Sequence, residues 1–166
     1  MSGLEGTDQP RGTGGATASR WSPAVEDEHG LRAMESFGDP SEREVRLRSL
    51  PESAATARRL AQIVALRWKV GPRVTEDTAL LVSELVGNAV RHTGARCFGL
   101  HLRKGSGRIR VMVRDPSRGL PCLLPVQETD ISGRGLFLVD KLSDRWGVDL
   151  LPMGKTTWFE MRVSDR

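Results

Sequence analysis

The feature that most constrains this chain is a pair of alternating segments around the tripeptide Gly105-Ser106-Gly107. Apolar residues occupy every second position on both sides of it: Phe98, Leu100, Leu102, Ile109, Val111 and Val113. A period of two residues is typical of a strand with one buried face. Two such strands joined by a glycine-rich turn predict a β-hairpin, so the fold must contain a sheet that buries one side.

Two amphipathic helices are predicted before this hairpin. The first runs from about Pro51 to the breaker Gly71-Pro72, with apolar residues at helical spacing: Ala54, Ala57, Leu60, Ala61, Val64 and Trp68. The second starts near Thr75, a candidate N-cap, and runs to about His92. A short alternating strand around Val45 and Leu47 precedes both helices.

The elements after the hairpin complete the pattern. Three prolines between Pro116 and Ser132 predict a loop, and the next helix presents Leu136, Val139 and Leu142 on one face. Two last strands are expected around residues 146–150 and 156–163. The order predicts an α+β fold, a two-layer α/β sandwich whose mixed, mostly antiparallel sheet carries helices on one face.

The first forty residues differ from the rest in composition. Residues 1–40 contain seven acidic and three basic residues, many glycines, and apolar residues without a regular period. Such a segment buries too little apolar area to fold, so we predict a disordered acidic tail over 1–40 and one folded domain over 41–166. No run approaches the roughly 18 apolar residues of a membrane span, and no signal-like stretch begins the chain. We therefore expect a cytoplasmic protein without membrane contact.

The predicted domain is basic. The chain has a net charge of +4, so residues 41–166 carry +8 against the acidic first segment. A basic surface favours anionic partners. No aromatic and basic platform or helix-turn-helix pattern accompanies this charge, which argues against direct nucleic-acid binding. Cys97 and Cys122 lack metal-ligand or redox spacing, and we interpret both as reduced.

Three polar features could carry chemistry. Glu84 and Asn88 are four residues apart, so they share one stripe of the second helix, where they would form either a Mg²⁺ site or a solvated face. The sequence Gly133-Arg134-Gly135 at a helix start could receive a phosphate or simply form a turn. Asp115 ends a strand, where its carboxylate could face a pocket or begin an Asx turn.

In chain order, four segments resemble the conserved boxes of the GHKL ATP-binding fold, also called the Bergerat fold. They are residues 83–92 (the N box), 113–119 and 133–136 (two glycine boxes) and 154–160 (the closing strand motif). The resemblance spans about residues 43–163 and is greatest to bacterial anti-sigma factors of the serine/threonine-kinase type. One departure is Ser117, which stands where the first glycine box normally has a glycine.

The resemblance implies ATP and Mg²⁺ as cofactors and a role for each matching residue. Asn88 would coordinate Mg²⁺ bound to the phosphates, and Glu84 would act as general base. Asp115 would accept a hydrogen bond from the adenine amino group, with support from Thr157. The other implied binding residues are Gly119 near the base, Gly133, Arg134, Gly135 and Leu136 at the phosphates, and His92 on the phosphate or lid side.

The resemblance also implies a function and partners. The protein would sequester a sigma factor and would phosphorylate a serine or threonine of an anti-anti-sigma antagonist. A non-catalytic, ATP-dependent switch that binds partners is the alternative. Histidine-kinase catalysis is disfavoured, since we find no upstream helix pair with a phospho-acceptor histidine. A homodimer is left open.

Overall fold

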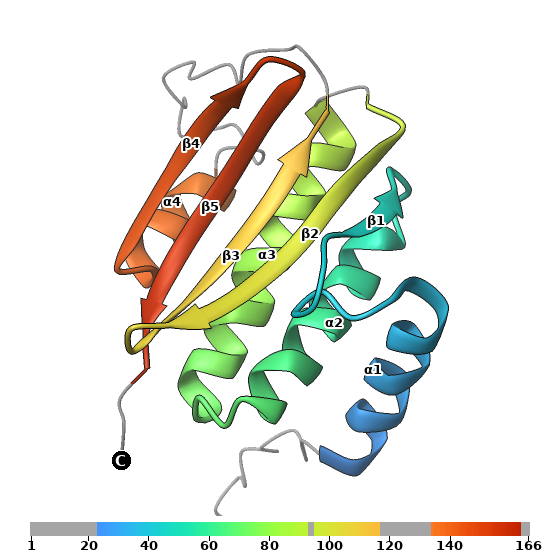
Figure 1. Cartoon of the computed structure of the whole chain (residues 1–166), viewed down its shortest axis with the longest axis vertical. Helices are drawn as coiled ribbons and strands as arrows, with labels where there is room; N and C mark the ends of the chain where they lie inside the picture. The colour runs from blue at the N-terminus through green and yellow to red at the C-terminus, as the bar shows by residue number, and fades with distance from the viewer. Residues whose placement is uncertain (1–22, 93–94, 117–133, 164–166) are drawn as a thin grey trace, which may run out of the picture.

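A five-stranded sheet forms one layer of the molecule, and helices form the other (Figure 1). The structure is a computed structural model, and it describes residues 23–92, 95–116 and 134–163. The strand order is β1-β2-β3-β5-β4, and every neighbouring pair is antiparallel. The predicted α+β sandwich with helices on one face is confirmed, but the described strands form an antiparallel sheet and not the mixed sheet that was expected.

The strands are β1 (Val45–Arg48), β2 (Cys97–Gly105), β3 (Arg108–Asp115), β4 (Arg145–Leu151) and β5 (Gly154–Arg162). Residues 106 and 107 form the two-residue turn of the predicted hairpin, and both have positive φ, 53° at Ser106 and 68° at Gly107. Positive φ at both central positions is the geometry that matches the twist of paired strands, which explains why glycine is favoured there.

The helices are α1 (Pro23–Phe37), α2 (Ser53–Arg67), α3 (Pro72–His92) and α4 (Arg134–Leu142). The prediction that the second helix of the folded domain starts at Thr75 is wrong, because α3 begins at Pro72, which suits a first helical position. The hydroxyl of Thr75 instead donates to the carbonyl of Gly71 at 2.8 Å. Within the described residues, no helix is both long and apolar enough to cross a membrane.

Helix α1 corrects the expectation of a disordered tail. Residues 23–37 are helical and pack against α2, where buried Gly30 lets the backbone approach Ile63; a Cβ at Gly30 would lie 3.0 Å from the Cβ of Ile63. The guanidinium of Arg67 also donates to Asp39 at 2.6 Å. Sequence periodicity missed α1 because close packing through a glycine leaves few large apolar residues. Residues 1–22 lie outside the described residues.

The core lies between the sheet and α2 and α3. It contains the apolar positions of the hairpin, which are all buried, together with Val45 and Leu47 of β1 and Phe159 of β5. Helix α4 contributes buried Val139, and the indole of Trp146 in β4 donates to Asp140 of α4 at 2.9 Å. These contacts hold α4 against the core and β4, and α4 also packs against α3.

Candidate functional site

The polar stripe of α3 carries two of the predicted site residues. Glu84 and Asn88 are both half-buried, whereas their neighbours Leu85 and Ala89 are buried in the core. Asn88 accepts a long hydrogen bond of 3.4 Å from the guanidinium of Arg91. Glu84 makes no hydrogen bond or ion pair with any residue that the structure describes. The side chains therefore form a polar border between the core and the surface on one helix.

The end of β3 places a carboxylate on the helix-facing side of the sheet. Side chains alternate along β3, and Asp115 shares the parity of buried Val111 and Val113. Its exposure is only 3%, so the carboxylate lies within the molecule at the last residue of the strand. A carboxylate buried at a strand end can recognise a hydrogen-bond donor of a ligand there.

Thr157 lies beside this carboxylate in the sheet. Its register partner on β3 is Val113, while Asp115 pairs with Lys155, so Thr157 is diagonal to Asp115 on the same face. Diagonal neighbours of this kind are about 7–8 Å apart. Figure 1 shows that the end of β3 and the start of β5 lie at the same end of the molecule as the C-terminal end of α3. The fold therefore brings the strand ends that carry Asp115 and Thr157 to the same end of the molecule as the C-terminal end of α3, the helix that contains Asn88 (Figure 1).

Gly154 is a residue whose structural requirement the sequence did not reveal. Its φ is +136°, and a Cβ there would lie 2.2 Å from the carbonyl oxygen of Asp115 and 2.8 Å from the Cα of Pro116. The turn before β5 thus approaches the backbone of β3 so closely that only glycine fits. A glycine after Pro152 and Met153, between two predicted strands, indicates a turn but carries no sign of the close approach to β3.

The other predicted residues are described in part or not at all. Arg134, Gly135 and Leu136 are the first three residues of α4, as the helix-start prediction requires, but only their backbone is described. The backbone of His92 forms the last residue of α3. Gly119 and Gly133 lie outside the described residues, as does Ser117. Their predicted roles stay predictions.

The side chains available as metal ligands decide whether a divalent metal ion fits this site. In residues 23–92, 95–116 and 134–163, no three His, Cys, Asp or Glu side chains form a cluster that could hold a metal. A divalent ion here would have the amide oxygen of Asn88 and would take its other ligands from water and phosphate. Mg²⁺ accepts such a set, because it retains water and binds through few protein oxygens. The residues fit Mg²⁺ that arrives with a nucleotide.

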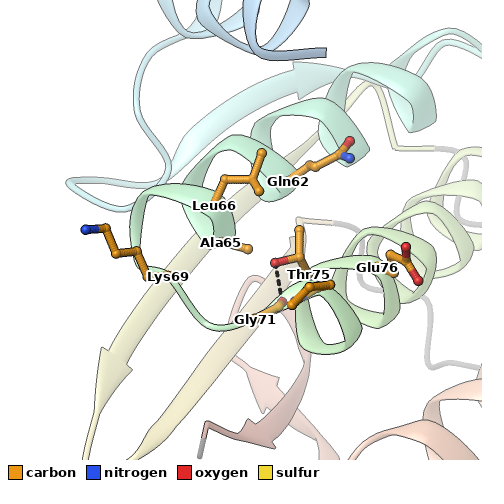
Figure 2. A pocket seen from close by; sticks show the side chains of 8 residues that line it. Gln62, Ala65, Leu66, Lys69, Gly71, Thr75 and Glu76 are labelled. Carbon is orange, nitrogen blue, oxygen red and sulfur yellow. Dashed lines mark hydrogen bonds between the residues drawn. The ribbon is translucent and has the colours of Figure 1, made fainter. Parts of the chain in front are cut away.

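A cavity of about 250 Å³ lies elsewhere, between α2 and the first turn of α3 (Figure 2). It is lined by Gln62, Ala65, Leu66, Lys69, Gly71, Pro72, Thr75 and Glu76. A helix rises about 1.5 Å per residue, so Thr75 and Asn88 are roughly 20 Å apart along α3. Among the predicted site residues that the structure describes, none lines this cavity.

Comparison with known proteins identifies the domain. A family model described as a histidine kinase-like ATPase domain matches residues 47–161. An uncharacterized protein of Streptomyces coelicolor is 52% identical over 46 residues, which cover 26% of this chain and 44% of that protein. The chain therefore spans less than half the length of this curated relative.

Two solved structures are also similar. The histidine kinase domain of the blue-light activated histidine kinase of Erythrobacter litoralis EL346 is 21% identical, with a TM-score of 0.44, over 89% of this chain and 77% of that domain. A second structure of that kinase is 21% identical, with a TM-score of 0.43, over 87% of this chain and 55% of the other.

Proposed function

The chain belongs to the family of histidine kinase-like ATPase domains, and from this premise we propose that it is an ATP-binding regulatory protein kinase. In this proposal it phosphorylates a serine or threonine of an anti-anti-sigma antagonist and, in a second complex, sequesters a sigma factor. The family supports ATP binding. The choice of acceptor and partners rests on the resemblance of the four boxes to anti-sigma factors, and these are our proposals.

The observation that carries the proposal is the buried carboxylate of Asp115 at the end of β3. A carboxylate has two oxygens and can accept several hydrogen bonds, so one that is 3% exposed at a strand end can accept a ligand donor in addition to its contacts within the protein. We assign it the exocyclic amino group of adenine, which donates to a carboxylate. Thr157, diagonal on the same face, would support this contact through its hydroxyl.

Asn88 would hold Mg²⁺ through its amide oxygen. The 3.4 Å hydrogen bond from Arg91 is at the long end for such a contact, so little energy opposes its replacement by a metal ion. The first turn of α4 would face the phosphates, since its backbone amides and the helix dipole favour an anion. ATP would supply the phosphoryl group that is transferred.

Glu84 lies one turn before Asn88 on the same stripe, which suits a general base. Its carboxylate would accept the proton of the acceptor hydroxyl while that oxygen bonds to the terminal phosphorus and the bond from this phosphorus to the oxygen bridging to ADP breaks. A positioned base contributes roughly 10²–10⁴-fold to such a transfer.

A non-catalytic switch is the second candidate, and one observation favours it. Bases are usually held by a third group, yet no described residue donates a hydrogen bond to Glu84. A protein that binds ATP and changes its affinity for partners without phosphoryl transfer needs Asp115 and Asn88 but not Glu84. The two candidates therefore differ in the role of one side chain.

The test measures ATP affinity by calorimetry and transfer of labelled phosphate from ATP to candidate antagonist proteins. Asp115→Asn should weaken ATP binding by about 1–3 kcal/mol, because the buried donor of adenine loses its charged acceptor. Arg114→Gln is the matched control, since Arg114 is adjacent in β3 but on the opposite face of the sheet. Glu84→Gln should leave ATP affinity nearly unchanged and lower transfer at least ~100-fold.

Each outcome selects between the candidates. Equal ATP affinity in Asp115→Asn and in the parent would remove the adenine assignment. Transfer by Glu84→Gln at the parental rate would remove Glu84 as base. If the parent binds Mg-ATP but transfers phosphate to no antagonist, the protein is a switch.

A further inference from the structure

The sheet has a second face that no described helix covers. In Figure 1 this face points toward the viewer, with α2, α3 and α4 behind the sheet. Side chains alternate along each strand, so the residues between the core positions point to this open face. In β3 these are Arg108, Arg110, Met112 and Arg114. The open face is therefore rich in arginine.

Five arginines meet at one end of the open face. Strand register aligns Arg103 of β2, Arg110 of β3, Glu160 of β5 and Arg145 of β4 in one row across the sheet. Arg108 and Arg162 form the next row. We call Arg103, Arg108, Arg110, Arg145 and Arg162 the arginine cluster.

Glu160 holds three members of the arginine cluster. Its carboxylate accepts hydrogen bonds from Arg110 at 3.0 Å, from Arg145 at 3.0 Å and from Arg108 at 3.4 Å, and the residue is only 7% exposed. The hydrogen bond from Arg145 is the largest of the effects that hold the pKa of Glu160 below its ordinary value. Asp149 of β4 adds a longer ion pair to Arg110 at 3.9 Å, so two carboxylates face three arginines. This part of the network therefore has a structural role and still carries an excess of positive charge.

The side chains of Arg103 and Arg162 take no part in this network of ion pairs. Both are exposed, and neither side chain has an ion-pair partner among the residues that the structure describes. Arg103 lies directly opposite Arg110, and Arg162 lies directly opposite Arg108. Like charges placed directly opposite each other on neighbouring strands destabilise a sheet. The positive field also reaches His101, whose pKa is lowered by burial and by Arg103.

We propose that the arginine cluster is a docking surface for an acidic segment of a partner protein. Two opposed pairs of arginines that cost stability are expected at a binding surface, where an anionic partner supplies the missing negative charge. Planar guanidinium groups suit carboxylates, because each can accept two parallel hydrogen bonds. This site is on the opposite face of the sheet from Asp115 and does not depend on nucleotide binding.

A nucleic-acid partner fits this face less well. Single strands bind where bases stack on exposed aromatic rings. Trp158 is the one Phe, Tyr or Trp side chain that the described strands direct to this face, and the guanidinium of Arg110 already lies 4.0 Å from its ring centroid. Gly147 lies against the same indole, since a Cβ there would be 2.8 Å from its Cζ2 atom. No ring face is left for a base unless Arg110 moves.

A second copy of the chain also fits less well. Two open faces placed together would oppose two arginine clusters, and like-charge contacts across an interface are costly. An acidic segment of another protein is the partner that the charge favours.

The experiment measures fluorescence anisotropy of a labelled oligoglutamate peptide with the full chain at low ionic strength, where surface charges are least screened. The test variant is R103E/R162E. Each introduced glutamate faces an arginine on the neighbouring strand, so the variant should melt at the parental temperature or above it. The control is R58E/R59E, which makes the same change in charge on exposed positions of α2.

We expect R103E/R162E to weaken peptide binding at least about tenfold and R58E/R59E to weaken it less than about threefold. Equal losses in the two variants would show that net charge alone binds the peptide and would overturn the proposal. Tighter binding of a thymidine oligonucleotide of equal charge, lost in R103E/R162E, would assign the face to nucleic acid instead. Self-association of the parent that R103E/R162E abolishes would assign it to a second copy.

Discussion

The two faces of β3 and β5 differ in how their side chains are stabilised. Toward the helices, Val111, Val113 and Phe159 are buried in the core, and Asp115 ends this row as a single buried carboxylate. Toward the open side, Arg110 and Glu160 form part of a charged network. Adjacent residues of one strand thus belong either to a core that ends in a candidate nucleotide site or to a surface that suits an acidic partner.

The face of the sheet to which a strand residue points therefore decides its role in this protein. On the covered face, apolar burial supplies stability, and the site is built where that burial ends. On the open face, oppositely charged side chains pair across strands, and the exposed pairs contribute little because water screens them. Changes on the covered face should therefore have larger effects than changes on the open face.

The largest effect is expected for Gly154→Ala. The added Cβ would meet the carbonyl oxygen of Asp115 at 2.2 Å, and φ of +136° is strained for alanine. Backbone atoms cannot rotate away as a side chain does, so we expect stability to fall by about 2–4 kcal/mol. Denaturant unfolding measures this loss, and calorimetry should show weaker ATP binding as the end of β3 shifts.

Gly105→Ala is the matched control for this change. Gly105 ends β2, and a Cβ there would meet no atom within 4 Å. Its variant should unfold like the parent. If Gly154→Ala were as stable as Gly105→Ala, the close approach between the turn and β3 would not be required.

A smaller effect is expected on the open face for Glu160→Gln. The glutamine keeps the shape but loses the charge that holds Arg108, Arg110 and Arg145, so stability at neutral pH should fall by about 1–3 kcal/mol. Chemical unfolding at fixed salt measures the difference. A loss that persists unchanged in high salt would contradict an electrostatic origin.

The pH dependence of this variant gives an independent check. The pKa of Glu160 is below its ordinary value of 4.5, so the carboxylate stabilises the fold fully above that value. This contribution is lost as the pH falls through the lower pKa of the folded state. The stability difference between the parent and Glu160→Gln should therefore be constant from pH 7 to about 5 and should shrink at lower pH.

Much of the fold could be predicted from the sequence, because strand and helix periods report burial. The hairpin, α2, α3 and α4 follow from the spacing of apolar residues. Helix α1 could not be predicted in this way, since its close contact with α2 is made through Gly30, and the ion pair from Arg67 to Asp39 joins α2 to the segment after α1. The spacing of apolar residues does not reveal a helix whose closest packing contact is made by a glycine.

The candidate site could be predicted only in part, because some of its residues belong to local motifs and others depend on contacts between distant segments. Asp115 and Thr157 follow from motifs, and strand register places them diagonally on one face. The requirement for Gly154 depends on a contact between two segments that are far apart in the chain, which local sequence does not report. The charge network around Glu160 likewise depends on the strand order β3-β5-β4, in which β5 pairs with both of the other strands.

The smallest effect is expected for Gly99→Ala, and it sharpens the comparison because Gly99 is also a close contact. The carboxylate of Glu44 crosses β2 above Gly99 and binds Arg114 of β3 through hydrogen bonds of 2.6–3.0 Å, which raise the pKa of Arg114. A Cβ at Gly99 would lie 2.1 Å from Oε1 of Glu44. Here the obstacle is the flexible end of a side chain, so Glu44 can move into water.

The net change for Gly99→Ala should be within about 0.5 kcal/mol. Loss of a partly exposed ion pair costs roughly 0.2–1 kcal/mol, while replacing a strand glycine by alanine returns about 0.4–1 kcal/mol through the unfolded state. A double-mutant cycle with Glu44→Gln separates the two terms. In the parent, Glu44→Gln should lower stability, whereas in Gly99→Ala it should have no further effect, because the ion pair is already broken. If Gly99→Ala destabilised the protein as much as Gly154→Ala, the open face would be as rigid as the covered one. The expectation that changes on the covered face have larger effects would then be wrong.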